Sequence, residues 1–258
     1  MVERWLSPEV LQWHIENDSG WPVQNDLRSR SYEILAHAEQ VLGLPPSELA
    51  LVDVITSLRR AIDRRLRALN SLYSFRDIPI RDRPHDLLIQ LESLGIIRSH
   101  MVLKLIAIRN AVEHEDIAPP DHEACKVFAE FTWYFLKSTD KMLHEVNSSF
   151  ALNPGGDDEK YYGLEIEYGP RNNWIARVRG WVKPKMIMED FGTEWICLRI
   201  EEMNTRDELA EILKRRGGPM KRNEHGRGKK KDDIYFNGTV RGPASALTKL
   251  TEAYFSVI

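Results

Sequence analysis

Hydrophobic residues recur three or four positions apart, as on one face of a helix, through most of residues 1–150. Proline and glycine residues divide this pattern into segments. It predicts five helices, at about residues 30–42, 47–73, 86–94, 98–115 and 121–146. The connections between them are short, which predicts that residues 47–148 form an antiparallel helical bundle. We interpret residues 1–46 as a helical lead-in, with a short helix that begins after Ser7.

The helix predicted at residues 47–73 has two different faces. Hydrophobic side chains form one of them. The other face carries five arginines: Arg59, Arg60, Arg64, Arg65 and Arg67. A run of like charges is usually a solvated face, which is the first interpretation. The alternative is a basic flank that lies near an RNA backbone.

The pattern changes from helical to alternating after a stretch rich in Asn, Ser, Pro and Gly, which we interpret as a linker at residues 149–160. Beyond it we predict strands at 161–168, 173–182, 194–200 and 233–240 and helices at 205–216 and 243–256. Strand segments that follow one another favour antiparallel pairing. The predicted fold class is therefore α+β: a helical bundle followed by a small mixed domain, residues 161–258, with an antiparallel sheet.

The composition is that of a soluble globular protein, with 42% hydrophobic and 29% charged residues in a chain of 258. No apolar run has the length of a membrane span, so we expect no membrane association. Cys125 and Cys197 are far apart and show no metal-binding spacing. These observations favour a protein of the reducing cytoplasm.

Basic residues are concentrated in one segment, although the net charge of the chain is −3. Residues 215–231 form a glycine-rich basic loop with eight Lys and Arg residues against one acidic residue, Glu224. Such a loop either contacts the phosphates of a nucleic acid or is simply solvated. The candidate nucleic-acid-binding residues in this loop are Arg215, Arg216, Lys221, Arg222, Lys229, Lys230 and Lys231.

The strand predicted at residues 173–182 adds two further candidates. Alternation places Arg177, Arg179 and Trp181 on one face of this strand. Cations interleaved with aromatic surface are typical of platforms that bind single-stranded nucleic acid. The alternative is a half-exposed strand whose arginines extend to solvent.

A short polar motif ends the helix predicted at residues 98–115. Arg109, Asn110 and His114 follow an apolar segment with the spacing Arg-Asn-x-x-x-His. Arg can hold a phosphoryl oxygen while His moves a proton, so the pair suits phosphate chemistry. Five residues correspond to about 140° of rotation on an ideal helix. We therefore expect the two side chains to converge only if the helix frays near His114 or if a second copy of the motif faces the first.

This motif, between two long helices, resembles that of the HEPN superfamily over roughly residues 47–146. The resemblance implies a metal-independent endoribonuclease that needs no cofactor. In this resemblance His114 is the general base on a ribose 2′-OH, Arg109 stabilises the charged phosphorane and Asn110 orients the motif or the phosphate. The products would be a 2′,3′-cyclic phosphate and a 5′-OH.

The resemblance also implies partners and a setting. The family commonly forms homodimers in which two motifs line one cleft, so we expect a homodimer through the helical bundle. RNA is the expected substrate, in a toxin–antitoxin, antiviral defence or RNA-processing role, and an antitoxin or another regulatory protein is a further expected partner. Other family members are inactive, and the alternative function is therefore a catalytically silent module that binds nucleic acid or protein.

Simpler roles for the motif residues stay open. Arg109 can pair with Glu113, four positions on, and His114 can interact with the helix dipole. A metal-dependent hydrolase is a third alternative, in which a divalent ion binds among acidic, His and Cys side chains. The residues of this cluster are Glu113, His114, Glu115, Asp116, Asp121, His122, Glu123 and Cys125. No established ligand spacing occurs among them, and we expect no metal site.

Overall fold

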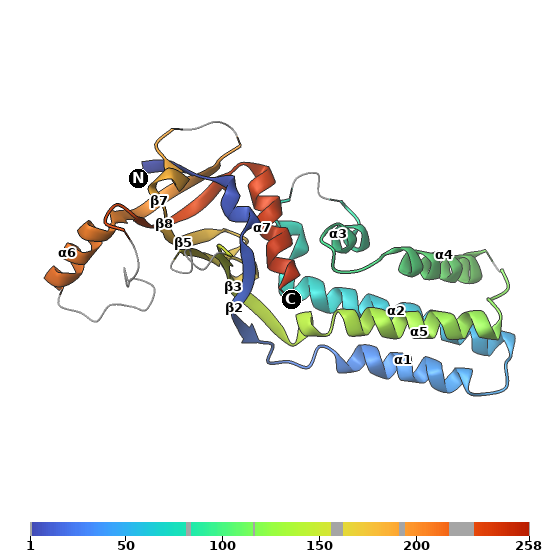
Figure 1. The fold of residues 1–258 in the computed structure, drawn as a ribbon. Coiled ribbons are helices and arrows are strands. Elements are labelled where there is room, and N and C mark those ends of the chain that lie inside the picture. Colours follow the sequence, from blue (N-terminus) through green and yellow to red (C-terminus); the bar gives the residue numbers. More distant parts are fainter. Residues whose placement is uncertain are drawn as a thin grey trace. The chain divides into compact units, whose positions relative to one another are not determined.

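The computed structural model has an α+β fold and describes residues 2–80, 84–115, 117–155, 162–190, 194–216 and 230–257. The chain divides into two compact units. One unit is mainly helical and comprises Pro22–Phe75 and Arg83–Val146. The other comprises Met1–Trp21, Arg76–Asp82 and Asn147–Ile258 and contains the β-sheet. Figure 1 shows the elements of both units.

The helical unit contains the five predicted helices: α1 (Ser29–Leu42), α2 (Glu48–Tyr73), α3 (Leu87–Ser93), α4 (His100–His114) and α5 (His122–Ser138). Helices α1, α2 and α5 pack against one another. Three polar residues cap helices, since Ser47, Asp86 and Asp121 accept hydrogen bonds from backbone N–H groups in the first turns of α2, α3 and α5. The helical expectation for this part of the chain is therefore confirmed.

Helix α5 ends earlier than predicted. The helix stops at Ser138, a short 3₁₀ turn follows at Lys141–Leu143, and strand β3 occupies Glu145–Asn153. The helix predicted to reach residue 146 is therefore wrong beyond Ser138. The linker predicted at residues 149–160 is also wrong for residues 149–153, because these pair with strand β4 (Gly163–Glu167) through a ladder that includes Phe150 and Leu152.

The sheet has eight strands in the order β2-β3-β4-β5-β8-β7-β1-β6. Strands β1 and β2 span Val2–Leu6 and His14–Pro22, and β5 to β8 span Arg177–Val182, Ile187–Met188, Ile196–Thr205 and Ile234–Gly242. In this order, every pair of neighbours from β3 onwards, β3-β4-β5-β8-β7-β1-β6, is antiparallel, as predicted. The predicted order of a bundle followed by a sheet is wrong, because β1 and β2 precede α1, the first helix of the bundle, in the chain.

The helical lead-in expected at residues 1–46 is therefore wrong in its first half. Strand β1 pairs with β7, nearly two hundred residues later in the chain, and β2 lies beside β3. The short helix expected after Ser7 is present as a 3₁₀ helix, Pro8–Gln12, with the Ser7 hydroxyl as its cap. The helical unit is thus an insertion between two neighbouring strands of the sheet.

Two helices belong to the sheet unit, α6 (Arg206–Arg216) and α7 (Ala244–Ser256), both close to their predicted bounds. Helix α7 contributes Tyr254 and Phe255 to a group of aromatic rings, packed mainly edge to face, that also contains Tyr168 and Trp174. The strand predicted at residues 173–182 would have included Trp174. This residue is instead buried in a turn before β5, because the chain there takes a positive φ.

The arginine-rich face of α2 is not uniformly solvated. The Arg65 side chain is fully buried, and its Nη1 donates to Asp140 Oδ1 at 2.9 Å. The Tyr32 hydroxyl donates to the other oxygen of Asp140 at 2.7 Å, and its ring lies 5.4 Å from the Arg65 guanidinium carbon. The expectation of a solvated arginine face is therefore wrong at Arg65, which joins α1 and α2 to the turn after α5.

Candidate active site on helix α4

Helix α4 is loosely packed for a helix of its apolar content. Only Val102 and Leu105 are buried among its residues, all of which lie in the described part of the chain. Leu103 is 37% exposed. The Ser99 hydroxyl before the helix donates to Glu92. The C-terminal half of α4, which carries the motif, is therefore accessible to solvent.

The three motif residues lie together at the end of α4. Arg109 Nη1 is 3.4 Å from His114 Nε2 and donates to Asn110 Oδ1 at 3.2 Å. Asn110 and His114 are exposed, and the Arg109 side chain is 30% exposed. Because a guanidinium nitrogen can only donate, His114 Nε2 is the acceptor in this contact.

The expectation that Arg109 and His114 converge only at a frayed helix end or across two copies of the motif is wrong. The helix remains regular through His114, and the contact lies within one chain. The long Arg109 side chain spans the rotation between the two positions. Convergence therefore does not need a frayed helix end or a second copy of the motif.

Glu113 is the ion-pair partner of Arg109. Its carboxylate makes a close ion pair with Arg109 Nη2 and accepts a hydrogen bond from Thr56 Oγ1 of α2 at 3.1 Å. The spacing of four residues had indicated the ion pair, but Thr56 has no sequence signal because it lies on another helix. A phosphate that binds Arg109 must therefore compete with Glu113.

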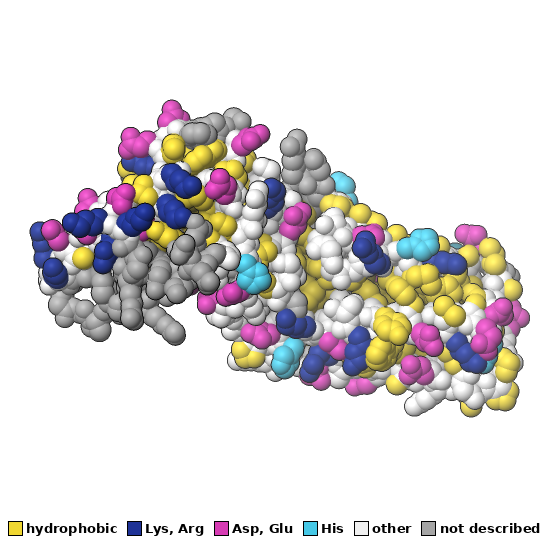
Figure 2. Space-filling view, viewed as in Figure 1, with side chains coloured by type: hydrophobic (Ala, Val, Ile, Leu, Met, Phe, Trp, Pro, Cys, Tyr) yellow, Lys and Arg dark blue, Asp and Glu magenta, His cyan; other side chains and the backbone are white. Residues whose placement is uncertain are grey.

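Further cations lie near the motif on α2. Burial raises the pKa of the Asp63 carboxyl above its usual value, while the charges of Arg59, Arg67 and Arg109 act in the opposite direction. Asp63 also pairs with Arg59 at 2.7 Å. The charges of two α2 arginines and of Arg109 thus act on the same carboxyl group, that of Asp63. Figure 2 shows hydrophobic side chains on the visible face of α4 and α5, with Lys, Arg and His side chains among them.

The alternative metal cluster is dispersed in the structure. Cys125 is buried and its thiol faces the Pro120 carbonyl at 3.6 Å, and burial raises its pKa to about 11. His122 Nε2 lies 2.9 Å from the Leu42 carbonyl. Within the described residues, which leave out Asp116, no three His, Cys, Asp or Glu side chains are grouped as metal ligands.

The two arginines of β5 lie beside carboxylates. Arg179 donates twice to Glu165 and lies 3.6 Å from Glu167, and the hydrogen bonds to Glu165 raise its pKa. Arg177 is exposed and lines a polar depression of about 160 Å³ with Glu167 and Arg179. Trp181 is buried beneath α6, so it offers no stacking surface. The expectation of an aromatic platform on this strand is therefore wrong.

Most of the basic loop lies outside the described residues, including the candidates Lys221, Arg222 and Lys229. Arg216 is the last residue of α6. Arg215 is 81% exposed and lies 3.7 Å from Glu211, and Lys230 and Lys231 are exposed. The described candidates of the loop and those of β5 belong to the sheet unit, whereas the α4 motif belongs to the helical unit.

Comparison with known proteins gives no match: no family model, curated protein or solved structure is similar to this chain. Among the described residues, no helix is both long and apolar enough to cross a membrane. The candidate site therefore rests on its own geometry, a solvent-accessible Arg109, Asn110 and His114 at the end of one helix.

Proposed function

We propose that the protein is a metal-independent endoribonuclease of the HEPN type, with Arg109 and His114 as its catalytic pair. The observation that carries the proposal is the 3.4 Å separation of Arg109 Nη1 and His114 Nε2 at an accessible helix end. One group there can bind a phosphate oxygen and the other can accept a proton, as transesterification of RNA requires.

Each motif residue has a role in this reaction. His114 takes the proton of the ribose 2′-OH, whose oxygen attacks the adjacent phosphorus. Arg109 stabilises the negative charge that develops on the phosphorane oxygens. Asn110, whose amide oxygen already accepts from Arg109, orients the guanidinium. The P–O5′ bond breaks and the 5′ oxygen takes up a proton, from the imidazolium that His114 has become or from water, which leaves a 2′,3′-cyclic phosphate and a 5′-OH.

Cleavage of a defined RNA oligonucleotide in EDTA tests the proposal. His114→Ala should lower the rate by about 10²–10⁴-fold because the general base is lost. Arg109→Ala should lower it by about 10²–10³-fold because charge stabilisation is lost. His100→Ala and Arg98→Ala are matched controls, since both side chains are exposed in or beside the same helix and lie outside the motif. Their rates should stay unchanged.

The chemistry of the products provides a second readout. An oligonucleotide with a 2′-deoxy sugar at the scissile position should resist cleavage, and the products of the all-RNA substrate should carry cyclic phosphate ends. Cleavage that persists in both motif variants, or that requires a divalent ion, contradicts the proposal.

A catalytically silent binding module is the second candidate. The close ion pair between Arg109 and Glu113 favours it, because Glu113 occupies the guanidinium that a phosphate would use. In this case the wild-type protein binds RNA or a partner protein, such as an antitoxin, without cleaving RNA. Binding measured by fluorescence anisotropy, combined with an absence of cleavage, distinguishes this candidate from the enzyme.

We further propose that two copies associate through the helical unit. The partly exposed Leu103 and the exposed Ala107 of α4 offer apolar surface beside the motif. Leu103→Lys should shift the protein towards the monomer in light scattering after size-exclusion chromatography. Ile89→Lys on α3 is the matched control, because Ile89 is similarly exposed, at 38%. A monomeric wild type contradicts this part of the proposal.

A further inference from the structure

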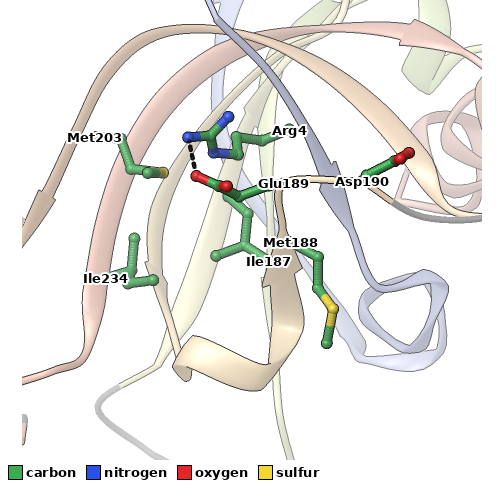
Figure 3. Close-up of a pocket in the computed structure, with 7 residues that line it drawn as sticks. All are labelled: Arg4, Ile187, Met188, Glu189, Asp190, Met203 and Ile234. Carbon is green, nitrogen blue, oxygen red and sulfur yellow. Dashed lines mark hydrogen bonds and ion pairs between the residues drawn. The ribbon is translucent and has the colours of Figure 1, made fainter.

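One end of the sheet contains an apolar groove of about 410 Å³, far in sequence from the α4 motif. Strands β1, β7 and β8 contribute Arg4, Met203 and Ile234, and β6 contributes Ile187 and Met188, followed by Glu189 and Asp190. Figure 3 shows the groove and these seven residues. Its volume lies within the range of small-molecule sites, roughly 300–1,000 Å³.

The walls of the groove are mainly hydrophobic. In Figure 3, Met203 and Ile234 lie on one side and Ile187 faces them from the other. Met203 and Met188 are 37% and 38% exposed, so both side chains can be reached from solvent. Methionine is flexible and polarizable, so these side chains can adapt to the shape of an apolar ligand.

Arg4 is the single cation among the described residues that line the groove. Arg4 Nη2 donates to Glu189 Oε1 at 2.8 Å, and Arg4 Nη1 donates to the Glu3 carbonyl at 2.9 Å. The side chain of Arg4 is 19% exposed, whereas that of Glu189 is 85% exposed. Arg4 also lies on a strand that is paired with β7, while Glu189 lies on a bend after the two-residue strand β6.

The two members of this ion pair are therefore unequal. Arg4 is held by its strand and by the Glu3 carbonyl, but the exposed Glu189 can leave at little cost, because ion pairs in water contribute little. Asp190 points away from Arg4 and from Met203 in Figure 3. The groove thus combines a fixed guanidinium with apolar walls, and a protein carboxylate already occupies the position where a ligand carboxylate would bind.

We propose that this groove binds a small monocarboxylate with an apolar tail. The carboxylate replaces Glu189 on the Arg4 guanidinium, which suits a planar two-oxygen acceptor. The tail lies against Met203, Ile234 and Ile187. Binding is non-covalent and independent of the function proposed for α4.

Methyl NMR of the full-length protein, labelled at the methionine methyl groups, tests the proposal with octanoate as the probe. Octanoate should produce a saturable shift of the Met203 signal, and the shift of the Met188 signal should follow the same binding curve. Octan-1-ol, which has the same tail length without the charge, should bind roughly tenfold more weakly because the charge-assisted hydrogen bonds are lost.

Variants at the ion pair separate the contribution of each partner. Arg4→Met should reduce octanoate binding to the level of octan-1-ol. Glu189→Gln should tighten octanoate binding by several-fold, because the competing carboxylate is gone. Arg177→Met and Glu194→Gln are the matched controls, since both residues are exposed in the same unit and neither lines the groove. They should bind both probes like the wild type.

Three results would overturn the proposal. The first is no saturable Met203 shift with octanoate, and the second is equal affinity for octanoate and octan-1-ol. The third is unchanged octanoate affinity in Glu189→Gln, a variant of an exposed side chain that should fold normally. This last test keeps the proposal falsifiable even if Arg4→Met fails to fold.

Discussion

Helices α2 and α4 pack against each other in the helical unit but differ in how much of each is buried. Both lie entirely within the described residues. Helix α2 buries eleven of its residues, whereas the more apolar α4 buries two. The hydrophobicity of a helix therefore does not measure its contribution to its own core. The apolar side chains that α4 leaves exposed, Leu103 and Ala107, precede the proposed catalytic motif on the same helix.

The difference in burial between α2 and α4 extends to one arginine on each helix. Arg65 of α2 and Arg109 of α4 each pair with a carboxylate. Arg65 is fully buried, and its Nε and Nη2 have no hydrogen-bond partner among the described residues. Arg109 is 30% exposed beside a histidine. The same residue type is thus enclosed in one helix and available to a ligand in the other.

The largest expected effect comes from removing each arginine in turn. Arg65→Ala should lower the free energy of unfolding by about 3–5 kcal/mol, because it leaves Asp140 without its buried partner. Arg109→Ala should lower it by about 1 kcal/mol or less, because its ion pair is partly exposed. Urea unfolding followed by circular dichroism measures both. Arg64→Ala, an exposed neighbour on α2, is the control, and equal losses for Arg65→Ala and Arg109→Ala would contradict the contrast.

The next largest effect on the free energy of unfolding is expected from shortening one leucine on each helix. Leu58→Ala on α2 should cost about 2–5 kcal/mol, because Leu58 is fully buried and its removal leaves a cavity. Leu103→Ala on α4 should cost about 1 kcal/mol or less, because Leu103 already contacts water. The same unfolding measurement applies, at a protein concentration where only the monomer is present. A large loss for Leu103→Ala in the monomer would show that α4 contributes to the core.

The smallest effect concerns Glu113, which pairs with Arg109. Glu113→Gln should strengthen RNA binding by roughly two- to fivefold, because a neutral amide competes less with phosphate for the guanidinium. Fluorescence anisotropy at a fixed low salt concentration measures the change. Glu115→Gln, an exposed acidic neighbour, removes the same charge without freeing Arg109 and should have the smaller effect. Equal effects would mean that only net charge matters.

The helices could be predicted because their signal is local. A hydrophobic face repeats along α2, and Ser47 and Asp121 begin their helices with side-chain caps. Strand β2 lacks such a signal, because it has no buried residue and lies at the edge of the sheet. It is instead held by contacts distant in sequence, such as Ser19 with Ser148 and Ser149.

The candidate site was predictable only in part. The spacing of Arg109 and His114 identified the motif, and the four-residue interval to Glu113 indicated its ion pair. The contact between Arg109 and His114 depends on side-chain reach, which backbone rotation alone does not describe. The burial of Arg65 depends on Asp140, 75 residues away. Arg65 follows Leu58 and Ala61 at the spacing of the buried face of α2, but this local pattern does not identify Asp140 as its partner.

The insertion of the helical unit between β2 and β3 has a consequence for synthesis on the ribosome. All five helices emerge before β3, so the helical unit can fold while β1 and β2 still lack their partners. Strand β1 waits for β7, where Val2 pairs with Ile200. At typical elongation rates this delay is roughly 10–40 s. Strand β1, the first to be made, is thus paired only after β6 and β7 emerge, and until then its edges are open to pairing with other chains.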